Sequence, residues 1–441
     1  MSKKDTLHII KYIDLMICGV LFMRVFEVNG GKRLNGCLQV QGAKNSALPI
    51  LAATLLIKDK SIIHNCPMLS DVDAALKILV MLGCVCVRDE ETVIVDASDA
   101  ANYIVSKELM SEMRSSVVFL GAIVSRMGKA VISSPGGCEL GPRPIDLHIS
   151  SLKRMGVKID EEDGYLKCSA PEGIKGAEIS LAFPSVGATE NIMITASTAK
   201  GTTVINNAAK EPEISDLADF LNGSGARISG AGSNRIIIEG VTSLHSCEHR
   251  VIPDRIVAAT YLSAAALTKG KVKIEQCGAV NMISVLNFFQ DIGCSIKSNG
   301  SCIELIGSVD YKNTKKIITE VYPGFPTDAG PLVVPLFCKL SGTQEIKETI
   351  FKNRFRYVDQ LNKFGCEISL KDNTATVNGI KNFKCADVNC TDLRGGAALV
   401  LAALAAEGVS TVSDIYHIER GYCKLDQNLK LLGADIKESD V

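Results

Sequence analysis

A cysteine stands in an unusual context in SSPGGCELGPRPIDLH, residues 133–148. Glycines and prolines flank Cys138, and Arg143 follows five positions later. Glycine and proline disfavour the regular helix or strand on which a buried structural cysteine would lie. Arg143 and a helix expected to begin near Pro144 would both lower the pKa of the thiol and favour the thiolate. From residue types alone, either the loop presents a thiol to an anionic ligand, or Cys138 is a spare member of the sixteen cysteines.

Polar and cationic residues recur at the expected starts of helices and in the loops before them. They are Lys44 and Asn45, Arg114, Arg143, Ser185 with Val186 and Gly187, Glu211 and Glu213, Asp254 and Arg255, Asp328, Arg354, Asp392 with Arg394, and Arg420. Helix N-termini attract anions through their free N–H groups and the helix dipole. A single surface arginine is ordinarily a solvated charge, but six cations at equivalent helix starts predict a cationic cleft. These six are Lys44, Arg114, Arg143, Arg354, Arg394 and Arg420. Such a cleft fits a ligand that carries phosphate and carboxylate groups.

Six internal repeats explain why these positions are equivalent. Each repeat contains an amphipathic helix that ends at a glycine and passes directly into a strand, as in MLGCVCV and KFGCEIS. The six glycines are Gly83, Gly156, Gly225, Gly293, Gly365 and Gly433, with separations of 73, 69, 68, 72 and 68 residues. Glycine at this position is typical of a helix that ends in the left-handed conformation.

An apolar helix precedes each amphipathic one, for example IVAATYLSAAAL in the fourth repeat. Because it is apolar nearly all round, we expect it to be a buried central helix. Helix, strand, helix and strand pair make an α/β unit of about 70 residues, well above the minimum for one βαβ element. Three such units surround one core, so the sequence predicts two three-repeat domains.

The two ends of the sequence predict how the domains are joined. The sixth repeat stops at GADIKESDV, before the second strand of its hairpin, and residues 24–40 look like the missing piece. We therefore expect an extension at residues 1–23, one domain at 44–252, and a second made of 24–43 plus 253–441. The chain would cross between domains near residues 44 and 252, which makes a hinge with little freedom to twist and suits a cleft that closes on its ligand.

Composition excludes several classes of function. The 48 basic and 49 acidic residues nearly cancel and tryptophan is absent, which argues against a nucleic-acid module. The cysteines follow helix and strand patterns rather than disulfide or zinc spacings, and this usage predicts a reducing cytoplasm and no metal. The apolar run YIDLMICGVLF at residues 12–22 has the character of a signal segment, but Asp14 interrupts it and no small-residue cleavage site follows. We interpret the run as an extension, and we expect no membrane insertion.

Seven motifs, in order along residues 24–441, resemble those of the UDP-N-acetylglucosamine enolpyruvyl transferases. They are GAKNSALPIL, PGGCELGPRPIDLH, SVGATENIM, FPTD, NRF, TDLR and HIERGY. The resemblance implies an inside-out α/β barrel in each of two domains. It also implies transfer of the enolpyruvyl group of phosphoenolpyruvate to the 3-hydroxyl of UDP-N-acetylglucosamine, with release of phosphate, as the first committed step of peptidoglycan synthesis. No cofactor and no metal is expected, and the partners are these two small molecules.

The resemblance assigns roles residue by residue. Cys138 matches the catalytic thiol and proton donor, and Asp328 matches the likely general base near the sugar 3-hydroxyl. Contacts to phosphoenolpyruvate are implied for Lys44, Asn45, Arg143, Arg394 and Arg420, with Lys44 and Arg420 also counted as catalytic. Contacts to the UDP-sugar are implied for Arg114, Arg143, Pro144, Ile145, Asp146, Leu147, Ser185, Val186, Gly187, Asp328 and Ile350. Arg354 and Asp392 complete the expected cleft.

The residue types fit this chemistry. Adding an alcohol to an enol phosphate requires an acid for the methylene carbon and a base for the hydroxyl, which Cys138 and Asp328 provide. The sequence departs from the family pattern at two places. Phe183-Pro184 stands where some relatives have a lysine just before SVG, which concerns a diphosphate contact, and Val118 stands where some have an aromatic residue. Two rival functions stay open, namely transfer to shikimate 3-phosphate and a silent paralogue that only binds the UDP-sugar. PGGCELGPRP argues against the first, and the presence of Lys44, Cys138 and Asp328 against the second.

Overall fold

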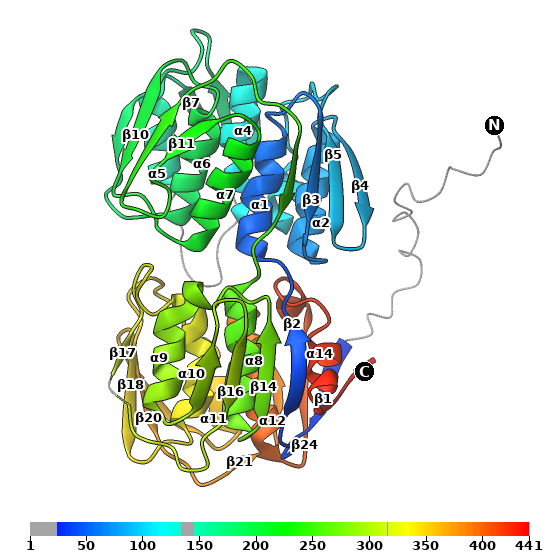
Figure 1. Cartoon of the computed structure of the whole chain (residues 1–441), viewed down its shortest axis with the longest axis vertical. Coiled ribbons are helices and arrows are strands. Elements are labelled where there is room, and N and C mark those ends of the chain that lie inside the picture. Colours follow the sequence, from blue (N-terminus) through cyan, green and yellow to red (C-terminus); the bar gives the residue numbers. More distant parts are fainter. Residues whose placement is uncertain (1–23, 134–144, 315, 441) are drawn as a thin grey trace, which may run out of the picture.

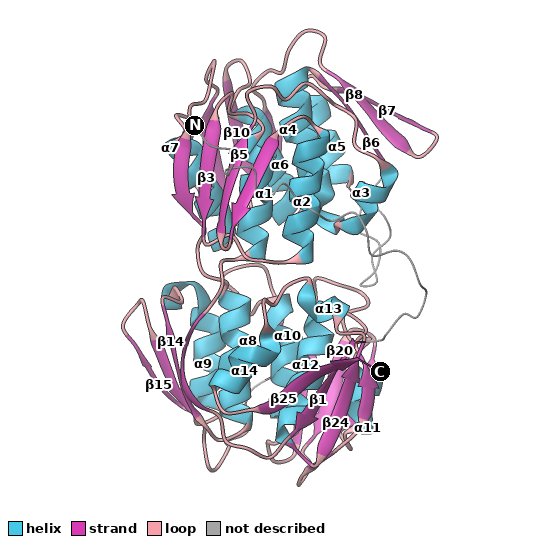
Figure 2. Cartoon of the chain, turned by 90° about the vertical axis from the view of Figure 1, so that its right-hand side faces the viewer, coloured by secondary structure: helices cyan, strands magenta, loops and turns pink. Residues whose placement is uncertain are grey.

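The computed structural model describes residues 24–133, 145–314 and 316–440, which form two lobes stacked along the long axis of the molecule (Figure 1). A view turned by 90° shows strands on the outer surfaces of both lobes and helices within (Figure 2). The chain is therefore an α/β protein. Within the described ranges, no helix has the length and apolar character needed to cross a membrane.

The upper lobe contains the elements from α1 to β13. Its helices are α1 (Lys44–Thr54), α2 (Ser70–Met81), α3 (Lys107–Glu112), η1 (Arg114–Val117), α4 (Val118–Met127), α5 (Asp146–Arg154), α6 (Val186–Ala196) and α7 (Pro212–Gly223). Its strands are β3 (Lys60–His64), β4 (Val85–Asp89), β5 (Thr92–Asp96), β6 (Lys129–Ser133), β7 (Lys158–Glu162), β8 (Tyr165–Ser169), β9 (Glu178–Ser180), β10 (Thr202–Asn206), β11 (Arg227–Ser229), β12 (Arg235–Glu239) and β13 (Cys247–Arg250). The sheets have the orders β13-β3-β5-β4, β6-β8-β7 and β11-β12-β10-β9.

The lower lobe contains the remaining elements, including the first two strands. Its helices are α8 (Arg255–Leu267), η2 (Ala279–Met282), α9 (Ile283–Asp291), η3 (Thr327–Ala329), α10 (Gly330–Phe337), α11 (Val358–Lys363), α12 (Leu393–Ala405), α13 (Tyr416–Glu419) and α14 (Leu425–Leu431). Its strands are β1 (Arg24–Asn29), β2 (Asn35–Gln39), β14 (Lys271–Glu275), β15 (Ser295–Ser298), β16 (Ile303–Ile306), β17 (Ile317–Ile318), β18 (Thr343–Lys347), β19 (Glu367–Lys371), β20 (Thr374–Asn378), β21 (Phe383–Lys384), β22 (Asp387–Asn389), β23 (Ala406–Glu407), β24 (Val409–Ser413) and β25 (Asp435–Asp440). The sheets have the orders β15-β16-β14-β2, β17-β18-β20-β19, β22-β24-β1-β25 and β21-β23.

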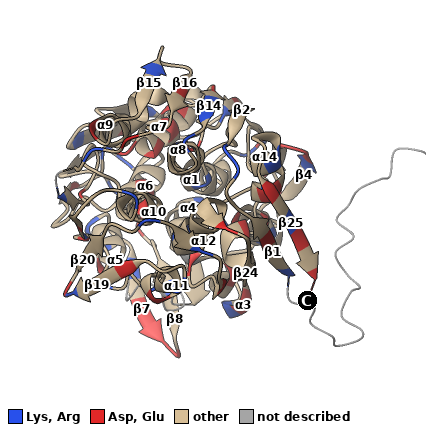
Figure 3. Cartoon of the chain, turned by 90° about the horizontal axis from the view of Figure 1, so that it is seen from below, with Lys and Arg blue, Asp and Glu red and all other residues tan. Residues whose placement is uncertain are grey.

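The central helix of each repeat is buried, and its neighbours are the other two central helices of the same lobe. The helices α1, α4 and α6 contact one another in the upper lobe, as α8, α10 and α12 do in the lower one. Seen from below, these helices lie in the middle of the molecule and carry little charge, while strands and the other helices surround them (Figure 3). One hydrophobic core cluster draws on residues 43–251, and a second joins residues 26–40 to 256–436. Each lobe is thus built around its own helical core.

The six repeat glycines lie where the amphipathic helices end. Their φ angles are all positive, between 82° and 100°, which L side chains adopt only with strain. Each repeat also has a feature that the sequence pattern did not predict, a parallel strand or bridge beside its first strand. The pairs are β13 with β3, β9 with β10, β2 with β14, β17 with β18, β22 with β24, and the bridge between Ile104 and Val131.

The N-terminal segment is part of the lower lobe. The strand β1 lies between β24 and β25 and is antiparallel to both, with Phe26 opposite Val412 and Glu438. The strand β2 then pairs in parallel with β14, so this one segment supplies strands to two different sheets. The sheets of the fourth and sixth repeats are joined through it.

The two chain crossings between the lobes run side by side. The N–H of Ala43 donates to the carbonyl of Ile252 at 2.7 Å, and the N–H of Asp254 donates to the carbonyl of Gln41 at 2.9 Å. A Cβ on Gly42 would lie 1.8 Å from the carbonyl oxygen of Asn65, so the crossing requires glycine there. The buried carboxylate of Asp216 anchors the crossing, because it accepts from the N–H of Ile252 at 3.2 Å and also pairs with His249 and Ser46. The paired crossings are therefore braced from the upper lobe.

Candidate active site

Asp328 lies in η3, immediately before the central helix α10, with two arginines against its carboxylate. Arg354 Nη2 is 2.6 Å from Oδ1, and Arg394 Nη2 is 3.4 Å from Oδ2. The arginine side chains are only 2% and 3% exposed, whereas that of Asp328 is 28% exposed. Two buried cations therefore contact the carboxylate from a rigid support, while part of the carboxylate stays accessible to a ligand.

Neighbouring groups fix this arrangement. Arg354 also donates to the carbonyl of Thr327 at 2.9 Å. It therefore binds both the backbone of the η3 turn and the side chain of Asp328. Glu348, buried at the end of β18, accepts from the hydroxyl of Thr327 at 2.9 Å and from the N–H of Ile350 at 2.7 Å. Glu348 thereby ties Ile350 to the turn that carries Asp328, a role that the sequence reasoning missed.

Arg394 is positioned by the start of α12. Asp392 is the N-cap, and its side chain accepts from the N–H groups of Arg394 and Gly395. The guanidinium of Arg394 lies over the ring of Tyr422, 5.3 Å from its centroid. Tyr422 in turn follows Arg420 by two positions and exchanges a hydrogen bond with Thr260 of α8. Local structure in the lower lobe thus fixes Asp392 and Arg394.

A second ion cluster joins the two lobes. Lys44 begins α1, and its Nζ lies 3.0 Å from Oδ2 of Asp71 in the first turn of α2. Arg420 of the lower lobe reaches the same carboxylate, with Nε 2.9 Å from Oδ1. The sequence analysis placed Lys44 and Arg420 in the cleft but did not single out Asp71. The only signal for Asp71 was its place in the first turn of a helix, where acidic residues are favoured in any case.

The starts of α5 and α6 lie together in the upper lobe. Ile145 is the N-cap of α5, Asp146 and Leu147 are its first residues, and Ser185 caps α6 through the N–H of Ala188. Val186 and Gly187 begin α6, and a Cβ on Gly187 would lie 3.3 Å from the ring of His148. Burial lowers the pKa of His148 to about 4, so the ring is neutral and its Nδ1 accepts from Asn191 at 3.0 Å. The close packing gathers the predicted UDP-sugar contacts from two segments at one place.

A buried acidic group lies at the lobe boundary. Arg255 at the start of α8 pairs with Glu213 of α7 at 3.1 Å, so this ion pair also spans the two lobes. Burial, followed by the charges of Glu213 and Glu211, raises the pKa of Glu190 in α6 to about 8. Glu190 is therefore mostly protonated at neutral pH. Arg255, Glu211 and Glu213 stand at helix starts as the sequence predicted, but Glu190 was not singled out.

Several predicted residues receive no geometric support. Cys138, Arg143 and Pro144 lie outside the described residues. Arg114 begins η1, but its side chain is not described either. Asn45 is the second residue of α1 and is exposed. Phe183, at the first departure from the family pattern, is 45% exposed beside Ser185, and Val118 is buried at the start of α4.

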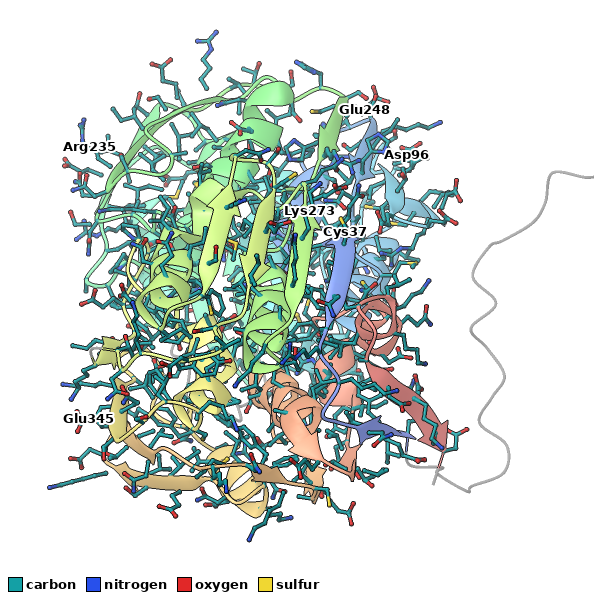
Figure 4. All side chains as sticks on the ribbon, turned by 60° about the horizontal axis from the view of Figure 1, so that its bottom comes forward. Cys37, Asp96, Arg235, Glu248, Lys273 and Glu345 are labelled. Carbon is teal, nitrogen blue, oxygen red and sulfur yellow. The ribbon has the colours of Figure 1, made fainter. Side chains whose placement is uncertain are left out.

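The described cysteines provide a contrast for Cys138. Burial raises the pKa of Cys66 and of Cys84 to about 12, so these thiols stay protonated. Cys37 is exposed on β2, directly opposite Lys273 of β14, on the outer sheet (Figure 4). Burial and the charge of Glu275 raise its pKa as well, in spite of Lys273. In all three thiols the nearby cation is outweighed and the pKa is raised, which is the opposite of what activates a cysteine.

Comparison with known proteins places the fold in a class. The sequence model of EPSP synthase (3-phosphoshikimate 1-carboxyvinyltransferase) matches residues 28–429. Among solved structures, the enolpyruvyl transferase NikO from Streptomyces tendae superimposes with a TM-score of 0.86 at 25% identity, over 95% of this chain and 100% of that chain. EPSP synthase from Acinetobacter baumannii gives 0.73 at 18% identity over the same shares, which supports the fold alone. The class is that of the enolpyruvyl transferases.

Closer relatives define the family within this class. UDP-N-acetylglucosamine 1-carboxyvinyltransferase 2 of Caldanaerobacter subterraneus subsp. tengcongensis is 48% identical over 94% of this chain and 99% of its own length. The UDP-N-acetylglucosamine 1-carboxyvinyltransferase of Endomicrobium trichonymphae is 47% identical over 93% and 98%. The chain belongs to the UDP-N-acetylglucosamine 1-carboxyvinyltransferase family.

Proposed function

We propose that the protein transfers the enolpyruvyl group of phosphoenolpyruvate to the 3-hydroxyl of UDP-N-acetylglucosamine and releases phosphate. The single observation that carries this proposal is the near-full-length identity of 48% to a transferase of that name. The site is compatible with it, because the lobe boundary presents cations at the helix starts of both lobes, as an anionic substrate requires. The reaction would be the first committed step of peptidoglycan synthesis, carried out in the cytoplasm.

The proposed mechanism is addition followed by elimination. Asp328 removes the proton of the sugar hydroxyl while Cys138 delivers a proton to the methylene carbon of phosphoenolpyruvate. The hydroxyl oxygen attacks C2 and a tetrahedral ketal forms. The ketal then loses phosphate from C2, while the former methylene carbon returns a proton to Cys138 and the double bond forms again. Alternatively, the Cys138 thiol can add across the double bond, with its sulfur bonding to C2 and its proton going to the methylene carbon, which holds the enol substrate as a covalent thioketal.

The proposed binding groups divide between the substrates. Lys44, Asn45, Arg143, Arg394 and Arg420 would contact phosphoenolpyruvate, and cations in a closed cleft stabilise its phosphate. The segments from Arg143 to Leu147 and from Ser185 to Gly187, together with Arg114, Asp328 and Ile350, would contact the UDP-sugar. Arg354 and Asp392 would not contact the substrates. Arg354 would hold the carboxylate of Asp328, and Asp392 would cap the start of α12.

We also propose the domain division that accompanies this function. The domains are 44–252 and 24–43 plus 253–441, each an inside-out α/β barrel, with residues 1–23 as an extension. The enclosed central helices and the two separate core clusters support this proposal. Closure about the hinge would bring the two lobes together around the substrates.

Product analysis tests the proposed reaction. The purified protein is incubated with phosphoenolpyruvate and UDP-N-acetylglucosamine, and the nucleotide product is examined by mass spectrometry and proton NMR. The proposal predicts an enolpyruvyl ether at the 3-oxygen of the sugar, with its vinyl protons visible. Recovery of unchanged UDP-N-acetylglucosamine would instead favour the silent, binding-only paralogue.

A further inference from the structure

Asp71 connects two cations that belong to different lobes. Its side chain is 4% exposed, and its two oxygens are shared between Lys44 of α1 and Arg420 of the lower lobe. Arg420 stands 349 positions from Asp71, and it makes two contacts, Nε to Oδ1 at 2.9 Å and Nη2 to Oδ2 at 3.5 Å. A carboxylate in this position bridges the boundary between the lobes next to the hinge.

The charges in this cluster do not balance. Burial would raise the pKa of Asp71, but the charges of Lys44 and Arg420 outweigh it and lower the pKa, so the carboxylate is ionised. One negative charge therefore faces two positive charges, with Lys44 only 12% exposed. Without Asp71, the two cations would repel each other as the lobes approach. The remaining positive charge is free to attract an anionic ligand.

We infer that Asp71 is a positioning residue for the phosphoenolpyruvate site, holding Lys44 and Arg420 together across the lobe boundary so that one anionic group contacts both. This inference rests on the proposed function, because it takes Lys44 and Arg420 as phosphoenolpyruvate contacts. Asp71 touches the cations and not the reacting atoms. Its effect should therefore appear mainly in the affinity for phosphoenolpyruvate.

A neighbouring carboxylate supplies a matched control. Asp73 lies in the same first turn of α2 and pairs with Arg88 at 2.6 Å. Both partners of that pair belong to the upper lobe, and Asp73 is 58% exposed. A substitution at Asp73 therefore removes an ion pair from the same helix turn without touching the lobe boundary.

The experiment compares Asp71→Asn, Asp71→Glu and Asp73→Asn by steady-state kinetics with each substrate varied in turn. Loss of a buried charge contact should raise the KM for phosphoenolpyruvate in Asp71→Asn about tenfold or more. The KM for UDP-N-acetylglucosamine should change by less than about twofold, since the lost contacts are to Lys44 and Arg420 only. Asp71→Glu keeps the charge but displaces it by one methylene, so its KM for phosphoenolpyruvate should rise about threefold. Asp73→Asn should match the unaltered enzyme.

The outcomes separate this inference from the proposed function. An unaltered enzyme that makes no product would contradict the proposed function. An active unaltered enzyme whose Asp71→Asn variant shows unchanged KM values, or equal changes for both substrates, would overturn the role of Asp71. If Asp71→Asn fails to fold, Asp71→Glu decides, because unchanged KM values in that variant would equally overturn the role.

Discussion

Arg354 and Asp328 form the tightest described contact at the candidate active site, with Nη2 and Oδ1 2.6 Å apart. The arginine is buried and also holds the Thr327 carbonyl, so Asp328 cannot turn away without breaking a charge-assisted hydrogen bond. Arg394 approaches the other carboxylate oxygen from α12. The proposed base is therefore supported from two elements that lie far apart in the sequence.

Asp328→Asn should abolish turnover while the protein still folds. An amide cannot accept the hydroxyl proton, and we expect a loss of at least about a thousandfold in kcat, within the range seen when a general base is removed. Removing the charge also leaves Arg354 and Arg394 without their shared anion, which should lower the free energy of unfolding by about 1–3 kcal/mol. Kinetics and urea unfolding check both effects. Asp359→Asn, at an exposed carboxylate in α11, is the control, and a fully active Asp328→Asn would contradict the assignment.

The raised pKa of Glu190 predicts a pH-dependent stability. Between its ordinary value of 4.5 and about 8, the folded protein holds a proton that the unfolded chain releases. The stabilising contribution of protonated Glu190 is therefore complete below pH 4.5, declines as the pH rises to about 8, and is lost above it. Glu190→Gln mimics the protonated acid and should remove this decline.

Urea unfolding at pH 6 and pH 9 tests this prediction. The free energy of unfolding of the unaltered protein should fall by about 2 kcal/mol more than that of Glu190→Gln over this interval. Glu178→Gln, at an exposed carboxyl in β9, should leave the pH dependence unchanged. Parallel pH profiles for the unaltered protein and Glu190→Gln would show that Glu190 titrates normally.

Two shortened chains test the role of the N-terminal strands. A chain that begins at Met23 keeps β1 and β2 and should retain full activity and stability. A chain that begins at Gln41 lacks both strands, so the edges of β24, β25 and β14 lose their partners. We expect the lower lobe of this chain to be unfolded. Circular dichroism and thermal unfolding measure the difference. The idea that residues 24–40 complete the sixth repeat fails if both chains behave alike.

The sequence predicted the regular parts of the fold for a physical reason. Six glycines recur at helix ends because only glycine adopts the left-handed conformation there without strain, so the repeat length could be counted directly. The parallel strands beside the first strand of each repeat were missed, because β9 and β22 are only three residues long and carry little periodicity. Short edge strands are defined by their partners rather than by their own pattern.

The candidate site was predictable to a similar extent. Lys44 and Arg394 stand at helix starts, which sequence periodicity locates, whereas Arg420 is the C-cap of the short helix α13, in the segment before α14. Asp71, the carboxylate that pairs with Lys44 and Arg420, was not predicted. It lies 349 positions from Arg420 in the sequence, and only tertiary packing brings the two together. Glu348 was missed for the same reason, since its N–H donors belong to a turn that no pattern marks.

Cys138 should be the most readily alkylated cysteine of the chain. A small epoxide that carries a phosphonate should modify it preferentially when UDP-N-acetylglucosamine is present, because the phosphonate would occupy the proposed phosphate site of Lys44, Arg143 and Arg420. Cys138→Ser should lose both labelling and most turnover, whereas Cys138→Asp should keep turnover and escape the epoxide. Peptide mass spectrometry locates the label, with the exposed Cys37 as the internal control. Preferential labelling of Cys37, or full activity in Cys138→Ser, would remove the thiol from the mechanism.

Phosphate release from phosphoenolpyruvate tests the central claim most directly. The unaltered protein is assayed with UDP-N-acetylglucosamine and, separately, with shikimate 3-phosphate as the acceptor. The fold is shared with EPSP synthase, so the fold alone does not choose between these acceptors. We predict rapid phosphate release with UDP-N-acetylglucosamine and none above background with shikimate 3-phosphate. Release with shikimate 3-phosphate and not with the UDP-sugar would contradict the proposed function.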